Sequence, residues 1–244
     1  MGTMVVFTGK AGSGKSTILA NTACYLARVG KLVVGCLSCD LRYPSLPGLF
    51  RGVEIPPERS IGKLFTDNDP AKKFVEYPSC EGVFVSATAI TDNALEYEPP
   101  DKETIIEFLQ RLNNWYDVLL IEAEDIQLNL FSITSVRQSD IRFNVVMPSM
   151  QSMAWERATS SLYKELPGEV IQILNADSES FPIEELKKLI GPIGVQLPYV
   201  DQIPDCAEHG SPYYLAGMSG RYGRRYVKGL EKISTLIRNG GELE

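Results

Sequence analysis

The stretch TGKAGSGKST, residues Thr8–Thr17, decides the fold because it joins two runs of different character. The residues before it, MVVF, have the apolar, β-branched composition of a buried strand. The residues that follow, 15–30, repeat apolar side chains at helical spacing and end at a glycine. A strand, a glycine-rich loop and a helix in this order predict a sharp turn at the start of an α/β fold.

The loop fits the pattern GxxxxGK[ST], from Gly9 to Ser16. Glycines let consecutive backbone N–H groups turn inward on phosphate oxygens, and the helix N-terminus adds partial positive charge. Lys15 is expected to reach the β- and γ-phosphates, and the Ser16 hydroxyl is expected to bind Mg²⁺. The sequence therefore predicts a nucleotide site, formed in this loop by Gly9, Ala11, Gly12, Ser13, Gly14, Lys15, Ser16 and Thr17.

Short β-rich runs alternate with amphipathic helical runs along the rest of the chain. Strands are expected at 4–8, 31–38, 82–87, 117–122, 143–148, 170–175 and 193–198. Helices are expected at 15–30, 101–115, 152–166, 182–190 and 219–239, with Asp101 capping the second. This alternation predicts a three-layer α/β/α sandwich of the P-loop NTPase type with a mostly parallel central sheet. Since no linker or repeat interrupts it, residues 1–244 are expected to form one domain.

The composition is that of a globular protein, with 44% hydrophobic and 23% charged residues. Five cysteines are an odd number, so a disulfide framework is not expected and a reducing cytoplasm is the simpler interpretation. Cys36 and Cys39 have metal-site spacing, but without a second pair they are interpreted as small residues of a buried strand. Because His209 is the only histidine, a Ser-His-Asp hydrolase is poorly supported.

The segment KAGSGKS, Lys10–Ser16, resembles the deviant Walker A box KGGxGK[ST] of the ParA/MinD family of P-loop ATPases, with Ala11 in place of the first glycine. The resemblance implies ATP and Mg²⁺ as cofactors and a nucleotide-sandwich homodimer. In such a dimer Lys15 binds the ATP of its own subunit, and Lys10 reaches the phosphates held by the partner. The motif by itself leaves Lys10 equally compatible with a solvated loop lysine.

Two further segments resemble the switch regions of that family. CDLRYPSLPGLF resembles switch I and places Asp40 where a carboxylate orients the attacking water. YDVLLIE resembles the Walker B strand, so the resemblance implies a metal site made by Ser16, Asp40 and Glu122. Two departures stand out: Ser38 replaces an acidic residue, and Glu122-Ala123-Glu124-Asp125 lacks the usual Pro/Gly switch II. We therefore expect ATP hydrolysis, with Lys10, Lys15 and Asp40 as catalytic residues, to be slow or absent.

The last two strands resemble the adenine side of the family site. Asn175 is expected to contact the base, and the loop Pro198, Tyr199, Val200 and Asp201 is expected to close over it. An ordinary proline-rich loop is the alternative. The segment VVMPSMQSMAWERA looks more like the CpaE/TadZ branch, which positions pilus or secretion machinery, than like plasmid ParA.

The last helix has a basic face and an apolar face on a helical wheel. Residues 219–239 carry a charge of +5, against −7 for the whole chain. The expected packed face is Tyr222, Tyr226, Leu230, Ile233 and Ile237, and the basic stripe is Arg221, Arg224, Arg225, Lys228 and Lys232. A solvated face is the simpler interpretation of the stripe, although Arg221, Arg224, Arg225 and Lys228 could make weak, non-specific DNA contacts. The chain ends NGGELE soon after this helix, so direct membrane insertion through a C-terminal tail is not expected.

Three hypotheses for function follow. The first is an ATP-dependent dimerisation switch that positions or partitions a cargo, such as pilus or secretion machinery, the septum or DNA, through an unidentified protein partner. The second is a scaffold that holds ATP without hydrolysing it. The third is a bacterial tyrosine kinase of the same superfamily, suggested by Asp40-Leu41-Arg42-Tyr43-Pro44 and by the tyrosines near the C-terminus.

Overall fold

The computed structural model describes residues 2–66, 70–97, 100–124, 129–177 and 181–242. Their strands form one sheet in the order β3-β4-β2-β5-β1-β6-β7-β8, in which only β3 is antiparallel to its neighbour. The strands are β1 (Thr3–Thr8), β2 (Val34–Ser38), β3 (Val75–Glu76), β4 (Val83–Ser86), β5 (Val118–Glu122), β6 (Ile141–Val146), β7 (Val170–Asp177) and β8 (Ile193–Pro198). All seven strands expected from the sequence are confirmed, and the two-residue β3 was not foreseen.

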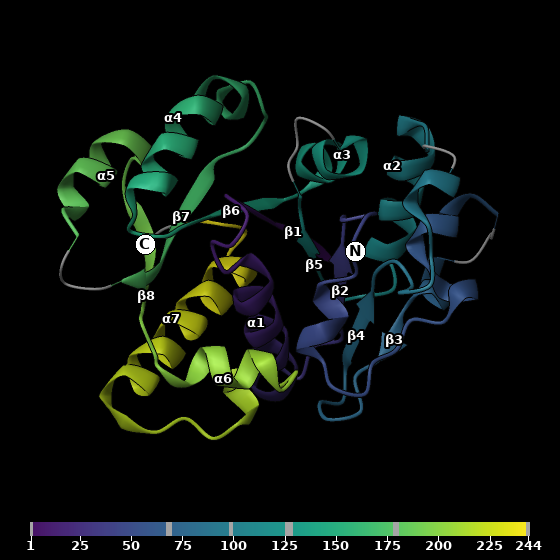
Figure 1. The fold of residues 1–244 in the computed structure, drawn as a ribbon, viewed down its shortest axis with the longest axis horizontal. Helices are drawn as coiled ribbons and strands as arrows, with labels where there is room; N and C mark the ends of the chain where they lie inside the picture. Colours follow the sequence, from purple (N-terminus) through teal and green to yellow (C-terminus); the bar gives the residue numbers. More distant parts are fainter. Residues whose placement is uncertain (1, 67–69, 98–99, 125–128, 178–180, 243–244) are drawn as a thin grey trace.

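Helices cover both faces of the sheet, which confirms the three-layer architecture (Figure 1). They are α1 (Lys15–Gly30), α2 (Lys102–Asn113), α3 (Leu130–Gln138), α4 (Met150–Lys164), α5 (Ile183–Ile190), α6 (Gln202–Glu208) and α7 (Gly220–Arg238). Alternation along β1 divides the core: Val5 and Phe7 pack with α1 and α7, whereas Met4 and Val6 pack with α2 and α3. A smaller cluster joins α4 and α5 to β6 and β7.

The central strands are buried on both faces, which explains their unbroken apolar runs. Every residue of VLLIE in β5 is buried, and so is every residue of β6. The expected cap is confirmed, because the Asp101 carboxylate accepts a 2.7 Å hydrogen bond from the Thr104 N–H at the start of α2. Cys36 lies in β2 as expected, whereas Cys39 directly follows the strand; both are wholly buried and unpaired by disulfides.

The packed face expected for α7 is right for four residues and wrong for Tyr222. Tyr226, Leu230, Ile233 and Ile237 are at most 2% exposed, whereas Tyr222 is 51% exposed. Helical periodicity does place Tyr222 above Tyr226, but it lies in the first turn of α7, where it lines a pocket instead of the core. A helical wheel predicts which face of a helix is apolar, but it does not show which turns of the helix have other elements packed against that face.

All strands except β3 run parallel to one another, so their carboxyl ends meet at one edge of the sheet. The glycine-rich loop follows β1 at this edge, Asp40 follows β2, and Glu122 ends β5. Asn175 and the loop after β8 lie farther along the same edge. No helix in the described part of the chain is both long and apolar enough to span a membrane.

Candidate functional site

The glycine-rich loop has a conformation that other residues cannot adopt. Gly9 has φ +133°, and a Cβ there would lie 2.3 Å from the carbonyl oxygen of Val145. Gly14 has φ +93°, and a Cβ there would lie 2.3 Å from the Asn175 side-chain nitrogen. These contacts explain why the sequence has glycine on both sides of the loop. The loop thus stays tight between β1 and α1 with its backbone close to β6 and β7.

Lys15 and Lys10 occupy different positions in this loop. The Lys15 ammonium is buried and donates to two carbonyl oxygens of the loop, that of Gly9 at 2.8 Å and that of Lys10 at 3.2 Å. The Lys10 side chain is half-buried, and its ammonium donates to the Ala11 carbonyl at 3.2 Å on the outside of the loop. One lysine therefore lies inside the cradle and the other at its rim.

Ser16 and Glu122 meet at the mouth of the loop. The Ser16 hydroxyl donates a hydrogen bond to Oε1 of Glu122, which the register of the sheet places beside Phe7 and Ser38. Oε2 of Glu122 is buried and accepts no hydrogen bond from the described residues. Burial raises the pKa of this carboxyl, while the Ser16 hydrogen bond and the Lys15 charge act in the opposite direction. An unsatisfied carboxylate oxygen next to a hydroxyl is the donor set that Mg²⁺ prefers, so these residues fit the metal.

Asp40 is engaged with its own loop. Its Oδ1 accepts hydrogen bonds from the backbone N–H groups of Arg42, at 2.8 Å, and Tyr43, at 3.2 Å. The carboxylate therefore stabilises the turn after β2. It is close enough to Glu122 to oppose the ionisation of that residue.

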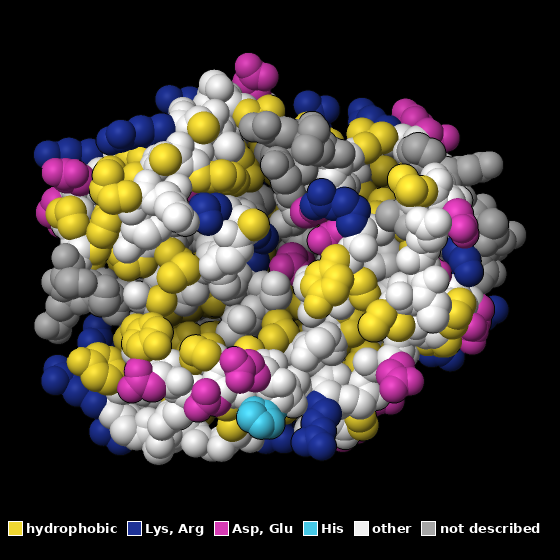
Figure 2. Space-filling view, in the orientation of Figure 1, with side chains coloured by type: hydrophobic (Ala, Val, Ile, Leu, Met, Phe, Trp, Pro, Cys, Tyr) yellow, Lys and Arg dark blue, Asp and Glu magenta, His cyan; other side chains and the backbone are white. Residues whose placement is uncertain are grey.

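An ion pair and two side-chain hydrogen bonds join the loops after β2 and β5. Arg42 forms an ion pair with Oε1 of Glu124, and its Nε lies 3.7 Å from Asp40. The Asn129 side-chain nitrogen donates to the Cys39 carbonyl at 2.7 Å and to the second oxygen of Glu124 at 3.1 Å. Figure 2 shows basic and acidic side chains next to each other near the middle of the face in view. Asp125, the last residue of the atypical switch II, lies outside the described residues.

Asn175 lies against the glycine-rich loop. Its side-chain nitrogen donates a 2.8 Å hydrogen bond to the carbonyl oxygen of Ser13. Asn175, which was expected to contact the adenine base, therefore supports the glycine-rich loop through its side-chain amide N–H.

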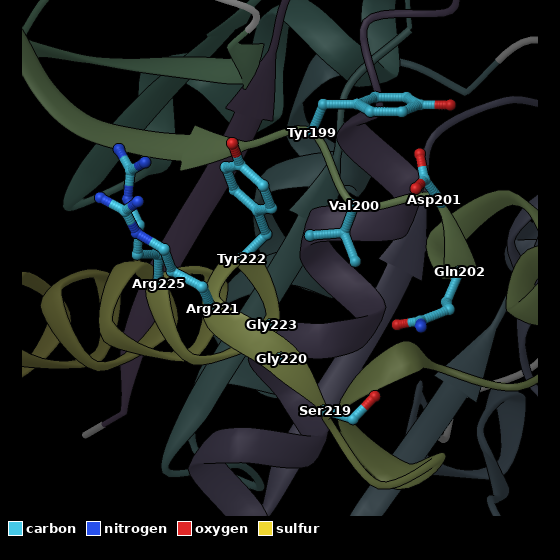
Figure 3. A pocket seen from close by; sticks show the side chains of 10 residues that line it. All are labelled: Tyr199, Val200, Asp201, Gln202, Ser219, Gly220, Arg221, Tyr222, Gly223 and Arg225. Atoms are coloured by element: carbon cyan, nitrogen blue, oxygen red, sulfur yellow. The ribbon is translucent and has the colours of Figure 1, made fainter.

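A pocket of about 490 Å³ lies between the loop after β8 and the start of α7 (Figure 3). Tyr199, Val200 and Asp201 line one side, and Pro198 is buried just before them at the end of β8. The remaining lining residues are Gln202, Ser219, Gly220, Arg221, Tyr222, Gly223 and Arg225. In Figure 3 the Tyr222 ring and the two arginines project from α7.

The α7 side of this pocket was missed by sequence reasoning. Tyr222 and Tyr199 are each 51% exposed, and the Arg225 guanidinium lies 6.0 Å from the centroid of the Tyr222 ring. Two of the four residues considered for DNA contact, Arg221 and Arg225, line the pocket, whereas Arg224 and Lys228 are exposed on α7. The sequence feature that could have indicated this side of the pocket is the position of Tyr222 next to the start of the last helix.

We compared the chain with family models and with solved structures. No family model matches the chain. MinD of Pyrococcus horikoshii OT3, a septum site-determining protein complexed with Mg-ADP, superposes with a TM-score of 0.76 at 19% identity over 96% of this chain and 95% of that one. A ParA family ATPase from Chlorobium tepidum TLS gives a TM-score of 0.79 at 16% identity over 96% and 99% of the two chains. The fold is that of the MinD and ParA ATPases.

A weaker likeness in sequence agrees with this MinD/ParA fold. An uncharacterized ATP-binding protein of Methanocaldococcus jannaschii is 23% identical over 206 residues, which are 83% of this chain and 74% of that protein. At the loop edge of the MinD/ParA fold, the chain brings together Lys10, Lys15, Ser16, Asp40 and Glu122. The loop after β8 contributes a pocket farther along that edge.

Proposed function

We propose that this chain binds ATP with Mg²⁺ at the glycine-rich loop and that ATP closes two copies of it face to face. The observation that supports this best is the division between the two lysines. Lys15 lies inside the loop, where it can neutralise the phosphates of its own nucleotide. Lys10 lies at the rim with a single carbonyl contact, where a second subunit can approach it.

Ser16 and Glu122 hold the metal in this proposal, because one carboxylate oxygen of Glu122 has no hydrogen-bond partner among the described residues. Mg²⁺, when bound, supplies charge neutralisation to the phosphate oxygens. The pocket beside Tyr199 and Tyr222 takes the adenosine end, since exposed aromatic rings offer faces on which a base can stack. Arg221 and Arg225 line the same pocket, where they stabilise the bound adenine ring and the negative charge of the nucleotide.

Exposed apolar side chains near the loop support a docking face for the second copy. Tyr43 follows β2, Leu130 starts α3 and Met150 starts α4, and they are 65%, 46% and 67% exposed. All three belong to segments at the carboxyl edge of the sheet, beside Lys10. Burying them against another subunit removes apolar surface from water.

The role that fits this switch is positioning or partitioning a cargo through a protein partner. Structural neighbours include a septum site-determining protein, a putative plasmid partition protein from Borrelia burgdorferi and a MinC:MinD complex from Aquifex aeolicus. We propose that hydrolysis is slow, because the Asp40 carboxylate already accepts two backbone hydrogen bonds of its own loop. The same observation favours the non-hydrolysing scaffold as the second candidate.

The tyrosine kinase hypothesis receives less support. Such kinases carry a flexible tyrosine cluster, but here Tyr213 and Tyr226 are buried and Tyr222 belongs to a long helix. Absence of phosphotyrosine after incubation with Mg-ATP is the expected result.

The test is the solution mass by light scattering in Mg-ATP and in Mg-ADP, followed over hours. We expect a dimer in ATP and a monomer in ADP. A dimer that decays with phosphate release indicates the switch, and one that persists without release indicates the scaffold. Lys10→Ala is expected to bind ATP but stay monomeric, whereas Lys188→Ala, an exposed lysine on α5, behaves as wild type. Equal masses in both nucleotides would refute ATP-dependent dimerisation.

A further inference from the structure

Asn175, near the end of β7, is tied to the glycine-rich loop by its side chain. The amide nitrogen donates a 2.8 Å hydrogen bond to the Ser13 carbonyl oxygen, between residues 162 positions apart in the chain. Alternation along β7 explains the direction of this side chain, because Ile171 and Ile173 pack on the α1 side of the core and Asn175 belongs to the same face. The end of β7 therefore lies against the loop that precedes α1.

The hydrogen bond fixes one peptide group of the loop. The Ser13 carbonyl and the Gly14 N–H belong to the same planar trans peptide, so they point in opposite directions. A carbonyl held toward Asn175 therefore turns the Gly14 N–H away from β7. In a glycine-rich loop of this kind, such N–H groups are the ones that bind phosphate oxygens.

Gly14 lets the amide approach this closely. It is the N-cap of α1, with φ +93°, and a Cβ there would lie 2.3 Å from the Asn175 side-chain nitrogen. A side chain at this position would push the amide off the Ser13 carbonyl. The glycine is thus required by its backbone conformation and by the contact with β7.

The backbone next to Asn175 is strained. Ala176 has φ +54° and is one of two non-glycine residues with a positive φ in the described part of the chain. The register between β7 and β8 shifts between Leu174 and Asp177, so the strained residue lies in an irregularity of the sheet. Irregularities of this type re-aim neighbouring side chains and occur beside functional sites. The left-handed Ala176 therefore fixes where β7 leaves the sheet and, with it, the position of the Asn175 amide.

We propose that Asn175 is a positioning residue for the phosphates: it holds the Ser13 carbonyl and thereby aims the Gly14 N–H at the triphosphate. The inference rests on the proposed nucleotide site and changes the role expected for Asn175 from base contact to loop support. The two roles differ in a measurable way. A base contact affects only ligands that have a base, whereas loop support affects ATP and inorganic triphosphate equally.

The test is isothermal titration calorimetry of the full-length protein with ATP and with inorganic triphosphate, both in Mg²⁺. Asn175→Ala is expected to weaken both ligands by the same factor, about tenfold, because the freed peptide no longer presents its N–H. Asn239→Ala, an exposed asparagine at the end of α7, should bind both ligands as wild type does. A residue that only stabilises the fold would leave both affinities unchanged.

Ala176→Gly tests the strained support without removing the amide. Glycine adopts a positive φ freely, so the end of β7 relaxes, and both affinities should fall in the same proportion but less than in Asn175→Ala. The melting temperature of the nucleotide-free variant should stay equal or rise. Lys31→Gly is the matched control, since Lys31 has φ +55° at the far end of α1, and its affinities should not change.

The outcomes separate this inference from the proposed function. A loss confined to ATP in Asn175→Ala assigns the residue to the base and overturns the positioning role, and so does an unchanged affinity for both ligands. If the wild-type protein binds neither ligand, the nucleotide site itself is refuted, and the positioning role with it.

Discussion

Ser16, the second residue of α1, donates a hydrogen bond to Glu122, the last residue of β5. The bond occupies one carboxylate oxygen and leaves the other buried without a partner among the described residues. A buried, half-satisfied carboxylate is costly for the nucleotide-free protein, since the ionised form has lost its hydration. A cation bound at the second oxygen would offset this cost.

Glu122→Gln tests this relationship. Burial raises the pKa of Glu122 in the folded state, so the folded protein binds this proton more tightly than the unfolded chain does. Stability from this group is present at low pH and is lost as pH rises through the folded pKa. We therefore expect the nucleotide-free variant to be at least as stable as wild type at neutral pH, with the advantage shrinking at acid pH. Thermal unfolding across pH measures this.

The same variant should lose most of its stabilisation by Mg-ATP, because the glutamine oxygen carries no charge for the metal. Glu169→Gln, an exposed position, serves as the control and should respond to Mg-ATP as wild type does. An undiminished melting shift in Glu122→Gln would remove Glu122 from the metal site.

Asn129 and Arg42 both link the loops after β2 and β5, but they should contribute unequally. The Asn129 side chain donates to Cys39 and Glu124, and its oxygen accepts from the Ser132 N–H as the N-cap of α3. Asn129→Ala should cost about 2 kcal/mol of unfolding free energy through the lost cap and the unsatisfied carbonyl. Arg42 is 68% exposed, so Arg42→Ala should cost less than about 1 kcal/mol.

Urea denaturation of both variants measures this difference. Asn129→Ser separates the two contributions of the asparagine, because its hydroxyl can still accept the cap hydrogen bond but the amide donor to Cys39 and Glu124 is lost. It should fall between wild type and Asn129→Ala. Equal stability of Asn129→Ala and wild type contradicts the assigned role.

The long apolar strands and α1 were predictable because local pattern and burial agree there. In contrast, α3 has the sequence LFSITSVRQ, which is weakly amphipathic and rich in β-branched and hydroxyl residues, so its own sequence does not favour a helix. The Asn129 cap and the burial of Phe131 and Val136 against α2 and the sheet stabilise it. The short helix α6 is not predicted from the sequence, because Pro204 interrupts its pattern.

The candidate site likewise has a part that the sequence predicts and a part that it does not. The phosphate loop is contiguous in sequence, so its pattern was sufficient to predict it. Asp40, Glu122 and Asn175 came from resemblance, since only the fold brings strand ends together. The Arg42–Glu124 ion pair joins residues far apart in the chain, and no local pattern reports such a contact.

Tyr222 should contribute to nucleotide affinity and little to stability. Its ring is 51% exposed and lines the pocket beside Tyr199. Loss of one stacking surface costs about 1–3 kcal/mol, so Tyr222→Ala should weaken ATP binding roughly 5- to 150-fold. Binding of inorganic triphosphate, which has no base, should not change. Isothermal titration calorimetry with both ligands measures this.

Two matched variants sharpen that experiment. Tyr222→Phe keeps the ring and should bind ATP as wild type does. Tyr226→Phe removes a buried hydroxyl that has no hydrogen-bond partner among the described residues, so it should be neutral or stabilising and leave binding unchanged. Equal losses for ATP and triphosphate in Tyr222→Ala would show that the pocket does not hold the base.

Gly229 lies where α7 packs directly against Leu197 of β8. It lies in the interior of the helix, where replacement by alanine ordinarily stabilises by about 1 kcal/mol. Here a Cβ would lie 2.2 Å from Cδ2 of Leu197, a fully buried side chain of β8. Overpacking of this kind costs about 1–3 kcal/mol, so Gly229→Ala should be destabilising despite the better helix propensity.

Chemical denaturation of Gly229→Ala decides between the two effects. Lys232→Ala, an exposed change on the same helix, should stay within about 0.5 kcal/mol of wild type. Leu197→Val removes the obstructing methyl group and should cost less in the Gly229→Ala background than in wild type, which a double-mutant cycle detects. If Gly229→Ala is more stable than wild type, α7 does not pack against β8 at this distance, and the glycine has no steric role.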